Sequence, residues 1–396
     1  MFFRMENTIQ NYDWGSTKLI QGLMDKPASE SEKWAEVWMG AHPKAPSKVG
    51  DSDLATLIDE NPIKFLGEAT AKKFENRLPY MMKLLAAAKG LSIQAHPNKQ
   101  QAEVGFKKEN EAGIPIDAPY RNYKDNNHKP EVIVALSEFW GLNGFKLIEE
   151  MIVLLEEVNI AEFQIYLEAL KNSKSRAEVT HLTKYILEMP ETELSSAVNQ
   201  LVAYAREHTY ARPEYRWILK SYDEYGDDCG LFFILMLNLV HLQPGEGMFC
   251  NAGDLHAYLY GLGVELMANS DNVLRGGLTP KHIDVPELLS LLTFDCRKPA
   301  LYLGDKLSEI ERVYNCPVHE FYLRSVSLEH DETWLQNVLR SAEIIVCVKG
   351  EIMIQELENS EKIKLRQGQS IFISADSEGY ELSGRGMLYI AATPIS

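Results

Sequence analysis

A segment of helical character in the middle of the chain, residues 146–236, lies between two segments with the pattern of β structure. Residues 1–145 contain short apolar runs, with Gly or Pro about every 8 to 15 residues, as in an all-β domain. Within residues 146–236, apolar side chains recur at helical spacing, for example Ile148, Met151, Leu154 and Leu155. We therefore expect about five helices here, and strands again after Gly245.

The end of the chain repeats a pattern from its second β segment. Residues 242–259 align with residues 365–382 at an offset of 123. The identical pairs are Leu242 with Leu365, Gly245 with Gly368, Phe249 with Phe372, Ala252 with Ala375 and Leu259 with Leu382. Chance similarity is the alternative, because most of these residues are Gly, Ala or Leu.

Units of glycine, strand, turn and strand build small jelly-roll barrels of the cupin type. We expect a mainly β fold with two such barrels and an all-α domain. The predicted division is residues 1–145 and 237–295 for a discontinuous first barrel, 146–236 for a helical insertion, and 296–396 for the second barrel. Residues 284–293 predict one more helix, with Asp284 as N-cap and Pro286 in its first turn. The second copy has Gly379 in place of His256, so we expect it to be free of metal.

Composition excludes several classes of function. The formal net charge of −17 opposes binding to nucleic acid or to anionic membranes. The longest apolar stretch, residues 231–240, is shorter than the ~20 residues of a membrane span. A secretory signal pattern is missing, and the five cysteines are scattered rather than paired in CxxC motifs. We expect a cytoplasmic protein, either a monomer or a weak homo-oligomer, that acts on a small molecule.

Four polar side chains are candidate metal ligands. Gln94 and His96 are two residues apart, so on a strand they would share one face. Glu131 and His256 complete a set of one amide oxygen, two imidazoles and one carboxylate, which suits a divalent ion such as Zn²⁺. The alternative is structural: strand residues with backbone partners, a surface carboxylate and a histidine in a turn.

Further candidates for substrate contact or proton transfer are Lys83, His128, Lys129, Arg275, Glu265, Asp271 and Asp13. If residues 128 and 129 lie on a strand, one of these two side chains points away from the metal. Arg275 precedes two glycines, which give the backbone freedom near a ligand. For each lysine or arginine the alternative is a solvated surface charge, and for each acid a structural hydrogen bond.

Several strings in order resemble type I mannose-6-phosphate isomerases (phosphomannose isomerases): NYDWGS at 11–16, EVWMGAHPKAPS at 36–47, SIQAHP at 92–97, HKPE at 128–131, NAGDLHAYL at 251–259 and NSDNVLRGGLTPKH at 269–282. The resemblance covers roughly residues 5–295. It implies one Zn²⁺ per chain, held by Gln94, His96, Glu131 and His256. It also implies that Arg275 lies in the active site, with Ser92 and Lys83 at the phosphate end.

The implied reaction interconverts mannose 6-phosphate and fructose 6-phosphate through a cis-enediol. Arg275 or Lys129 would add positive charge where the enediolate forms. The base that takes the C2 proton is left open among His128, Glu265, Asp271 and a water on the metal, with His128 and Glu265 ahead of Asp271. The same reaction serves mannose breakdown or, in reverse, the supply of GDP-mannose.

Two other classes of function are the alternatives. The first is a non-catalytic cupin protein that binds sugar phosphates, although such a protein has little reason to keep the four candidate ligands with Lys129 and Arg275. The second is a cupin oxygenase, which usually binds Fe²⁺ through histidines and a carboxylate. The glutamine and the cations suited to phosphate speak against the oxygenase.

Overall fold

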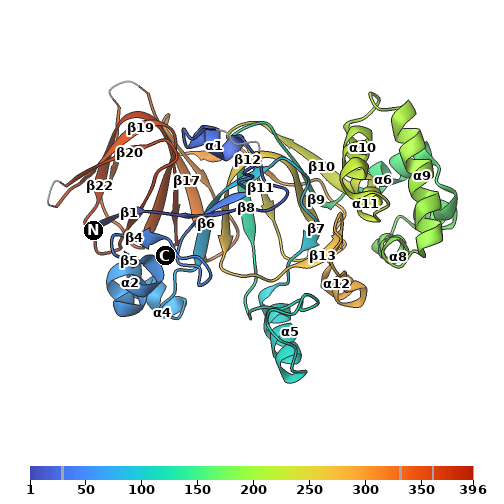
Figure 1. Ribbon diagram of the computed structural model, residues 1–396, viewed down its shortest axis with the longest axis horizontal. Helices are drawn as coiled ribbons and strands as arrows, with labels where there is room; N and C mark the ends of the chain where they lie inside the picture. Colours follow the sequence, from blue (N-terminus) through green and yellow to red (C-terminus); the bar gives the residue numbers. More distant parts are fainter. Residues whose placement is uncertain (28–30, 330–331, 359–360, 396) are drawn as a thin grey trace.

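Two large antiparallel sheets and a group of helices follow one another along the molecule (Figure 1). The computed structural model describes residues 1–27, 31–329, 332–358 and 361–395. The sheet of C-terminal strands lies at the left of Figure 1, beside both chain ends, and the other sheet lies in the middle. Helices α6 and α8 to α11 lie together at the right, so the central sheet is placed between the C-terminal sheet and the helices.

The central sheet contains eleven described strands, with the main order β14-β11-β8-β12-β6-β3-β2. They are β2 (Thr8–Gln10), β3 (Glu36–Met39), β6 (Tyr80–Ala87), β7 (Ile93–Ala95), β8 (Glu131–Ala135), β9 (Phe139–Phe145), β10 (Leu237–Leu242), β11 (Gly247–Cys250), β12 (His256–Ala268), β13 (Leu274–Gly277) and β14 (Leu301–Tyr302). The first part of β12 pairs with β7 and β9, and its second part pairs with β6 and β8. This long strand therefore joins the two parts of the sheet.

The second sheet contains nine described strands. They are β1 (Phe2–Met5), β15 (Asp305–Lys306), β16 (Glu311–Tyr314), β17 (Tyr322–Leu328), β18 (Thr333–Gln336), β19 (Glu343–Glu356), β20 (Lys362–Arg366), β21 (Ser370–Ile373) and β22 (Tyr380–Ala392), while β4 (Lys48–Val49) and β5 (Ser52–Asp53) form a separate pair. Strand β1 pairs with β21, and β14 pairs with β11. Each sheet therefore has one strand from the other side of residue 295, where we predict a boundary. The three-part division stays a prediction.

The two faces of the central sheet have different surroundings because neighbouring residues on a strand point to opposite sides. Leu84, Val132 and Val264 share one buried apolar cluster with Ile344 and Phe372 of the C-terminal sheet. The opposite face carries the charged residues that alternate with these side chains on β6, β8 and β12. One face thus holds the sheets together, and the other is available for a polar site.

Six α-helices occupy the predicted helical segment, all of it described: α6 (Ile148–Val158), α7 (Gln164–Ser173), α8 (Arg176–Leu187), α9 (Glu191–Glu207), α10 (Pro213–Tyr225) and α11 (Gly230–Met236), with a 3₁₀ turn at Ala161–Phe163. They form one core with residues of β7, β9 and β12. The additional helix is confirmed as α12 (Val285–Leu291), because the Asp284 side chain accepts a bond from the Glu287 amide. None of the helices in the described ranges is both long and apolar enough to cross a membrane.

The expectation of an all-β texture for residues 1–145 is wrong in part. The structure has α1 (Leu19–Leu23), α2 (Leu54–Glu60), α3 (Pro62–Leu66), α4 (Glu68–Lys73) and α5 (Lys99–Glu111) in this segment. Asp53 caps α2, Asn61 caps α3, and Asn98 forms a capping box with Gln101 at α5. These caps are local sequence signals for helices. The prediction of an all-β segment used the spacing of Gly and Pro and did not consider them.

The sequence repeat has a structural counterpart. At the offset of 123, β11 at 247–250 corresponds to β21 at 370–373, and His256, the first residue of β12, corresponds to Gly379, one residue before β22 begins at Tyr380. Gly245 and Gly368 both have positive φ, 89° and 82°, so the same turn precedes each strand. At Gly379, the counterpart of His256, a Cβ would lie 2.2 Å from the Gln336 carbonyl oxygen. The second copy therefore has no room for a side chain at this position.

Candidate metal centre and active site

Three neighbouring strands place three candidate residues in one row. Gln94 on β7 pairs with His256 on β12 on one side and with Arg275 on β13 on the other. Residues directly opposite each other in antiparallel strands project from the same face. Sheet register therefore brings an amide, an imidazole and a guanidinium to one side, although up to 181 residues separate them in the chain.

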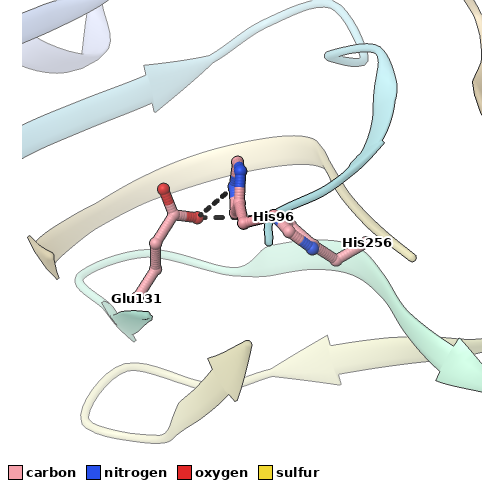
Figure 2. A group of neighbouring side chains, drawn as sticks. All are labelled: His96, Glu131 and His256. Carbon is pink, nitrogen blue, oxygen red and sulfur yellow. Dashed lines mark ion pairs between the residues drawn. The ribbon is translucent and has the colours of Figure 1, made fainter. Parts of the chain in front are cut away.

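His96, Glu131 and His256 form a compact buried group (Figure 2). Glu131 Oε2 lies 3.5 Å from His96 Nε2 and 3.4 Å from His256 Nε2. The two imidazole centroids are 4.9 Å apart. One atom from each residue lies within 4.8 Å of the others, and the three side chains are nearly inaccessible to solvent.

Backbone carbonyls determine the tautomers of both histidines. His96 Nδ1 lies 2.7 Å from the Asn272 oxygen, and His256 Nδ1 lies 3.0 Å from the Asp254 oxygen. Because a carbonyl only accepts hydrogen bonds, each neutral ring carries its proton on Nδ1 and directs a lone pair from Nε2. Both Nε2 atoms and Glu131 Oε2 lack a hydrogen-bond partner among the residues that the structure describes. Three buried lone pairs that converge in this way are the donor set of a divalent metal ion.

The charge states at pH 7 agree with metal binding. Burial, assisted by the nearby charge of Lys129, lowers the pKa of His96 to about 4, so this ring is neutral. Burial alone would raise the pKa of Glu131, but Lys129 and the two imidazoles outweigh it and hold that pKa well below its usual range. Lys129 Nζ lies 2.8 Å from Glu131 Oε1, leaving Oε2 directed at the histidines.

A row of alternating charges continues from this group across the same face of the sheet. Met267 pairs with Glu131, and Glu265, two residues earlier on β12, pairs with Lys83 on β6. Lys83 Nζ lies 2.9 Å from Glu265 and 3.2 Å from Glu36. Glu36 also accepts a bond of 2.7 Å from Trp38 Nε1. Lys83 and Glu265 are each at most 5% exposed, so this is an interior ion-pair network.

Burial and the neighbouring charges together shift the pKa values of Glu265 and Lys83. Burial raises the pKa of Glu265, although Lys83 acts in the opposite direction. Burial would lower the pKa of Lys83, but Glu265 and Glu36 outweigh it and raise that pKa. Lys83 is therefore charged, and Glu265 is a more basic carboxylate than one in water.

His128 and Lys129 point to different partners. Lys129 contacts Glu131, whereas His128 Nε2 lies 2.7 Å from Glu320, which precedes β17 of the C-terminal sheet. Neither residue belongs to a strand, because β8 begins at Glu131. His128 thus contacts the C-terminal half of the chain.

Arg275 has a different environment from the other cations. Its side chain is half-buried, and burial lowers the pKa of its guanidinium. Within the described residues it makes no ion pair and no hydrogen bond. Lys281 lies near enough for Arg275 and Lys124 to lower its pKa, although burial is the larger cause. These three cations have no carboxylate partner in the described part of the chain, so they can receive an anion.

The remaining candidates lie at the rim or outside the metal group. Asp271 Oδ2 bonds Lys44 Nζ at 2.7 Å, and its other oxygen lies 3.6 Å from His42. Asp13 has a fully exposed carboxylate whose partner is Lys33, at 3.5 Å. Ser92 is partly exposed and lies one residue before β7.

Several residues at the site were not among the sequence candidates. Glu36, His42 and Lys44 belong to the string EVWMGAHPKAPS at 36–47. This string contributes to the family resemblance, but the sequence alone predicts no role for these three side chains. Glu320 was missed because it lies 192 residues from His128 and in the part of the chain that resembles the family only loosely.

The fold and the site define a sheet-rich protein with a buried group of two histidines and one glutamate suited to a metal ion. Residues 2–148 match the model of the catalytic domain of type I phosphomannose isomerases. The mannose-6-phosphate isomerase of Salmonella typhimurium is 40% identical over 97% of this chain and 98% of that protein. That of Homo sapiens is 34% identical over 94% and 93%.

Solved structures of phosphomannose isomerases are similar to this chain over its whole length. The apo form of the Salmonella typhimurium enzyme has a TM-score of 0.92 and 38% identity, covering 100% of this chain and 99% of that one. A mannose 6-phosphate isomerase bound with zinc and yttrium has a TM-score of 0.91, 38% identity and full coverage of both chains. The chain belongs to the type I phosphomannose isomerase family.

Proposed function

We propose that this chain is a zinc-dependent aldose–ketose isomerase that interconverts mannose 6-phosphate and fructose 6-phosphate. The observation that carries this function is the convergence of His96, Glu131 and His256 in a chain 40% identical to a mannose-6-phosphate isomerase over almost its whole length. A non-catalytic sugar-phosphate-binding protein is not favoured, because the buried donor set and its relatives both indicate an enzyme.

His96, Glu131 and His256 would hold the metal, with Gln94 from the adjoining strand as the fourth ligand. The register of Gln94 with His256 supports this assignment. When bound, Zn²⁺ polarises and orients the sugar oxygens. Lys129 keeps one oxygen of Glu131 occupied, so the other remains directed at the histidines.

Arg275 supplies positive charge at O1 and O2 of the open-chain sugar. Its side chain is half-buried and has no ion pair in the described part of the chain, and Arg275 pairs with Gln94 across β13 and β7. A preorganised cation in a partly desolvated site stabilises an enediolate more strongly than it would in water. Lys129 is the second candidate, although its ammonium already contacts Glu131.

Glu265 is the first candidate for the base that removes the C2 proton and returns it to C1. Burial raises the pKa of Glu265. The ion pair with Lys83 acts in the opposite direction, because it favours the ionised carboxylate that a base requires. His128 ranks second, because Glu320 occupies its Nε2 atom. Asp271 ranks third, because Lys44 and His42 bring its pKa below the usual value despite its burial.

The phosphate group is received by Lys281 and Lys124, beyond Arg275, with Ser92 on the chain segment that leads into β7. The absence of carboxylate partners in the described residues supports this cluster. Lys83, which we expect at the phosphate end, also forms ion pairs with two buried carboxylates, Glu36 and Glu265. Its contacts support a role in positioning Glu265. Asp271 and Asp13 remain candidates at the rim of the substrate site.

The two β halves are two cupin-type jelly-roll barrels, of which the second has lost its metal position. The correspondence of β11 with β21 at the offset of 123, the start of β22 within one residue of that expected from β12, and the blocked position at Gly379 support this. The net charge of −17 supports the absence of nucleic acid among its partners. A cytoplasmic location and a monomeric or weakly homo-oligomeric state complete the proposal.

The test is turnover of mannose 6-phosphate to fructose 6-phosphate in a coupled assay. Metal-stripped protein is assayed before and after addition of Zn²⁺. Activity that disappears with the chelator and returns with the metal supports the proposed function. A folded, zinc-loaded protein without turnover contradicts it.

A further inference from the structure

A cavity of 480 Å³ lies between the paired strands β9 and β10 and the helix α10. Its wall is formed by Trp140 on β9, His241 on β10 and Trp217 on α10, among others. This volume lies within the ~300–1,000 Å³ range of small-molecule sites. The cavity shares no residue with the metal group or with the proposed phosphate cluster.

Aromatic rings form a fixed platform in this cavity. Trp140 on β9 pairs with His241 on the neighbouring antiparallel strand β10, and their rings stack with centroids 4.0 Å apart and an interplanar angle of 9°. The Trp217 ring lies 5.8 Å from that of Trp140, at 50°. Glu138 accepts a bond of 3.1 Å from Trp140 Nε1 and lies 3.0 Å from His241 Nε2. Its carboxylate therefore holds both rings in place.

Two cations lie beside this platform. Arg216 and Lys220 are four residues apart on α10, so they share one face of the helix. Lys220 Nζ lies over the rings of Trp217 and Tyr260, at 4.7 and 5.0 Å, and its hydrogen bond goes to the Ala88 carbonyl at 3.5 Å. Neither cation has a carboxylate ion pair among the described residues, although the chain has 57 acidic and 40 basic residues.

We propose that this cavity is a second binding site, for a phosphorylated ligand whose ring stacks on the two tryptophans. Indole faces bind nucleobases and the apolar faces of sugars, and stacking contributes about 1–3 kcal/mol per nucleobase. A guanidinium receives a phosphate through two parallel hydrogen bonds, and the neighbouring ammonium adds a second charge. A mononucleotide and a sugar phosphate share this chemistry.

The test uses isothermal titration of the zinc-loaded full chain with GMP, mannose 6-phosphate and inorganic phosphate. The variant is Arg216→Ala with Lys220→Ala. The matched control is Arg206→Ala with Lys184→Ala, which removes two exposed cations from α9 and α8. We expect the cavity variant to weaken GMP, or the second equivalent of mannose 6-phosphate, at least tenfold. The control should bind as the wild type does, and isomerase turnover should be unchanged in both.

Titration with GMP and with mannose 6-phosphate distinguishes a nucleotide site from a sugar-phosphate site. GMP binding that depends on Arg216 and Lys220 assigns the site to nucleotides. A second, equally dependent equivalent of mannose 6-phosphate without GMP binding assigns it to sugar phosphates. The proposal is overturned if neither ligand responds to the cavity variant, or if inorganic phosphate binds as tightly as the ringed ligands.

Discussion

The Nε2 atom of His256 and the Oε2 atom of Glu131 face each other at 3.4 Å, and neither has a proton to share when His256 carries its own on Nδ1. Two buried lone pairs at this distance repel each other unless a cation lies between them. The Nε2 atom of His96, 3.5 Å from Glu131 Oε2, adds a third buried lone pair. The sequence of this chain therefore folds into a site that a divalent metal would stabilise.

Metal removal should lower stability as well as activity. Zinc at about 1,000 times its dissociation constant should stabilise the wild type by about 4 kcal/mol, because it binds the folded state alone. His96→Ala and Glu131→Gln should lose this increment, bound zinc and turnover together. Thermal melts with and without zinc, and metal content by mass spectrometry, provide the measurements. The exposed Glu103→Gln on α5 is the control, and stoichiometric zinc in both site variants would show that the ligand assignment is wrong.

Arg275 should affect the reaction rate far more than metal content. Arg275→Ala should lower kcat by about 100- to 1,000-fold, the usual effect of removing one preorganised group that stabilises developing negative charge. Arg275→Lys should recover part of the rate, because it restores charge without the paired geometry. Steady-state kinetics on zinc-loaded protein measure both. Near-normal turnover in Arg275→Ala would remove this residue from the mechanism.

The acidic limb of the pH–rate profile should report Glu265. A base must be ionised to act, so kcat/KM falls as the pH drops below its pKa, which burial raises above the usual value for glutamate. Lys83 lowers this pKa and Glu36 raises it. Lys83→Met should therefore move the limb to higher pH, and Glu36→Gln should move it to lower pH.

The controls for this prediction address folding and identity. Lys83→Met leaves two buried carboxylates without their cation and should cost about 3–5 kcal/mol of stability, so its profile is measured well below its melting temperature. Glu265→Gln should abolish the limb together with most of the activity. If the limb stayed in place in both neighbouring variants, the base would have to be sought at His128.

The sequence predicted elements whose signals are local. The helix after residue 284 follows from a capping aspartate and a proline, and both are in place in α12. The types of residue in the metal group were also evident from two short strings and one histidine. Their convergence was expected from the resemblance, since spacing alone gives no distance between β7, β8 and β12.

Contacts that depend on sheet register or on distant segments could not be predicted. The resemblance placed Lys83 at the phosphate end, and a lone lysine in a sequence gives no sign of its partners. Only the pairing of β6 with β12 and β3 shows that Glu265 and Glu36 surround it. Glu320 contacts His128 from the segment that precedes β17, 192 residues further along the chain. No local sequence pattern indicates such a contact.

Gly379 provides a test of why the second copy has no ligand. Its φ of 134° is unfavourable for any residue with a side chain, and a Cβ would lie 2.2 Å from the Gln336 carbonyl oxygen. Gly379→Ala should therefore lower the free energy of unfolding by more than the ~1–3 kcal/mol of backbone strain alone. Gly226→Ala is the matched control, because Gly226 also has positive φ, 67°, but open space around its Cβ position. Its cost should be about 1–2 kcal/mol, the usual cost of the left-handed region for a residue with a Cβ, and urea unfolding of both variants measures the difference. Equal losses would mean that the backbone at Gly379 adjusts, and that a side chain at the position of His256 was lost for another reason.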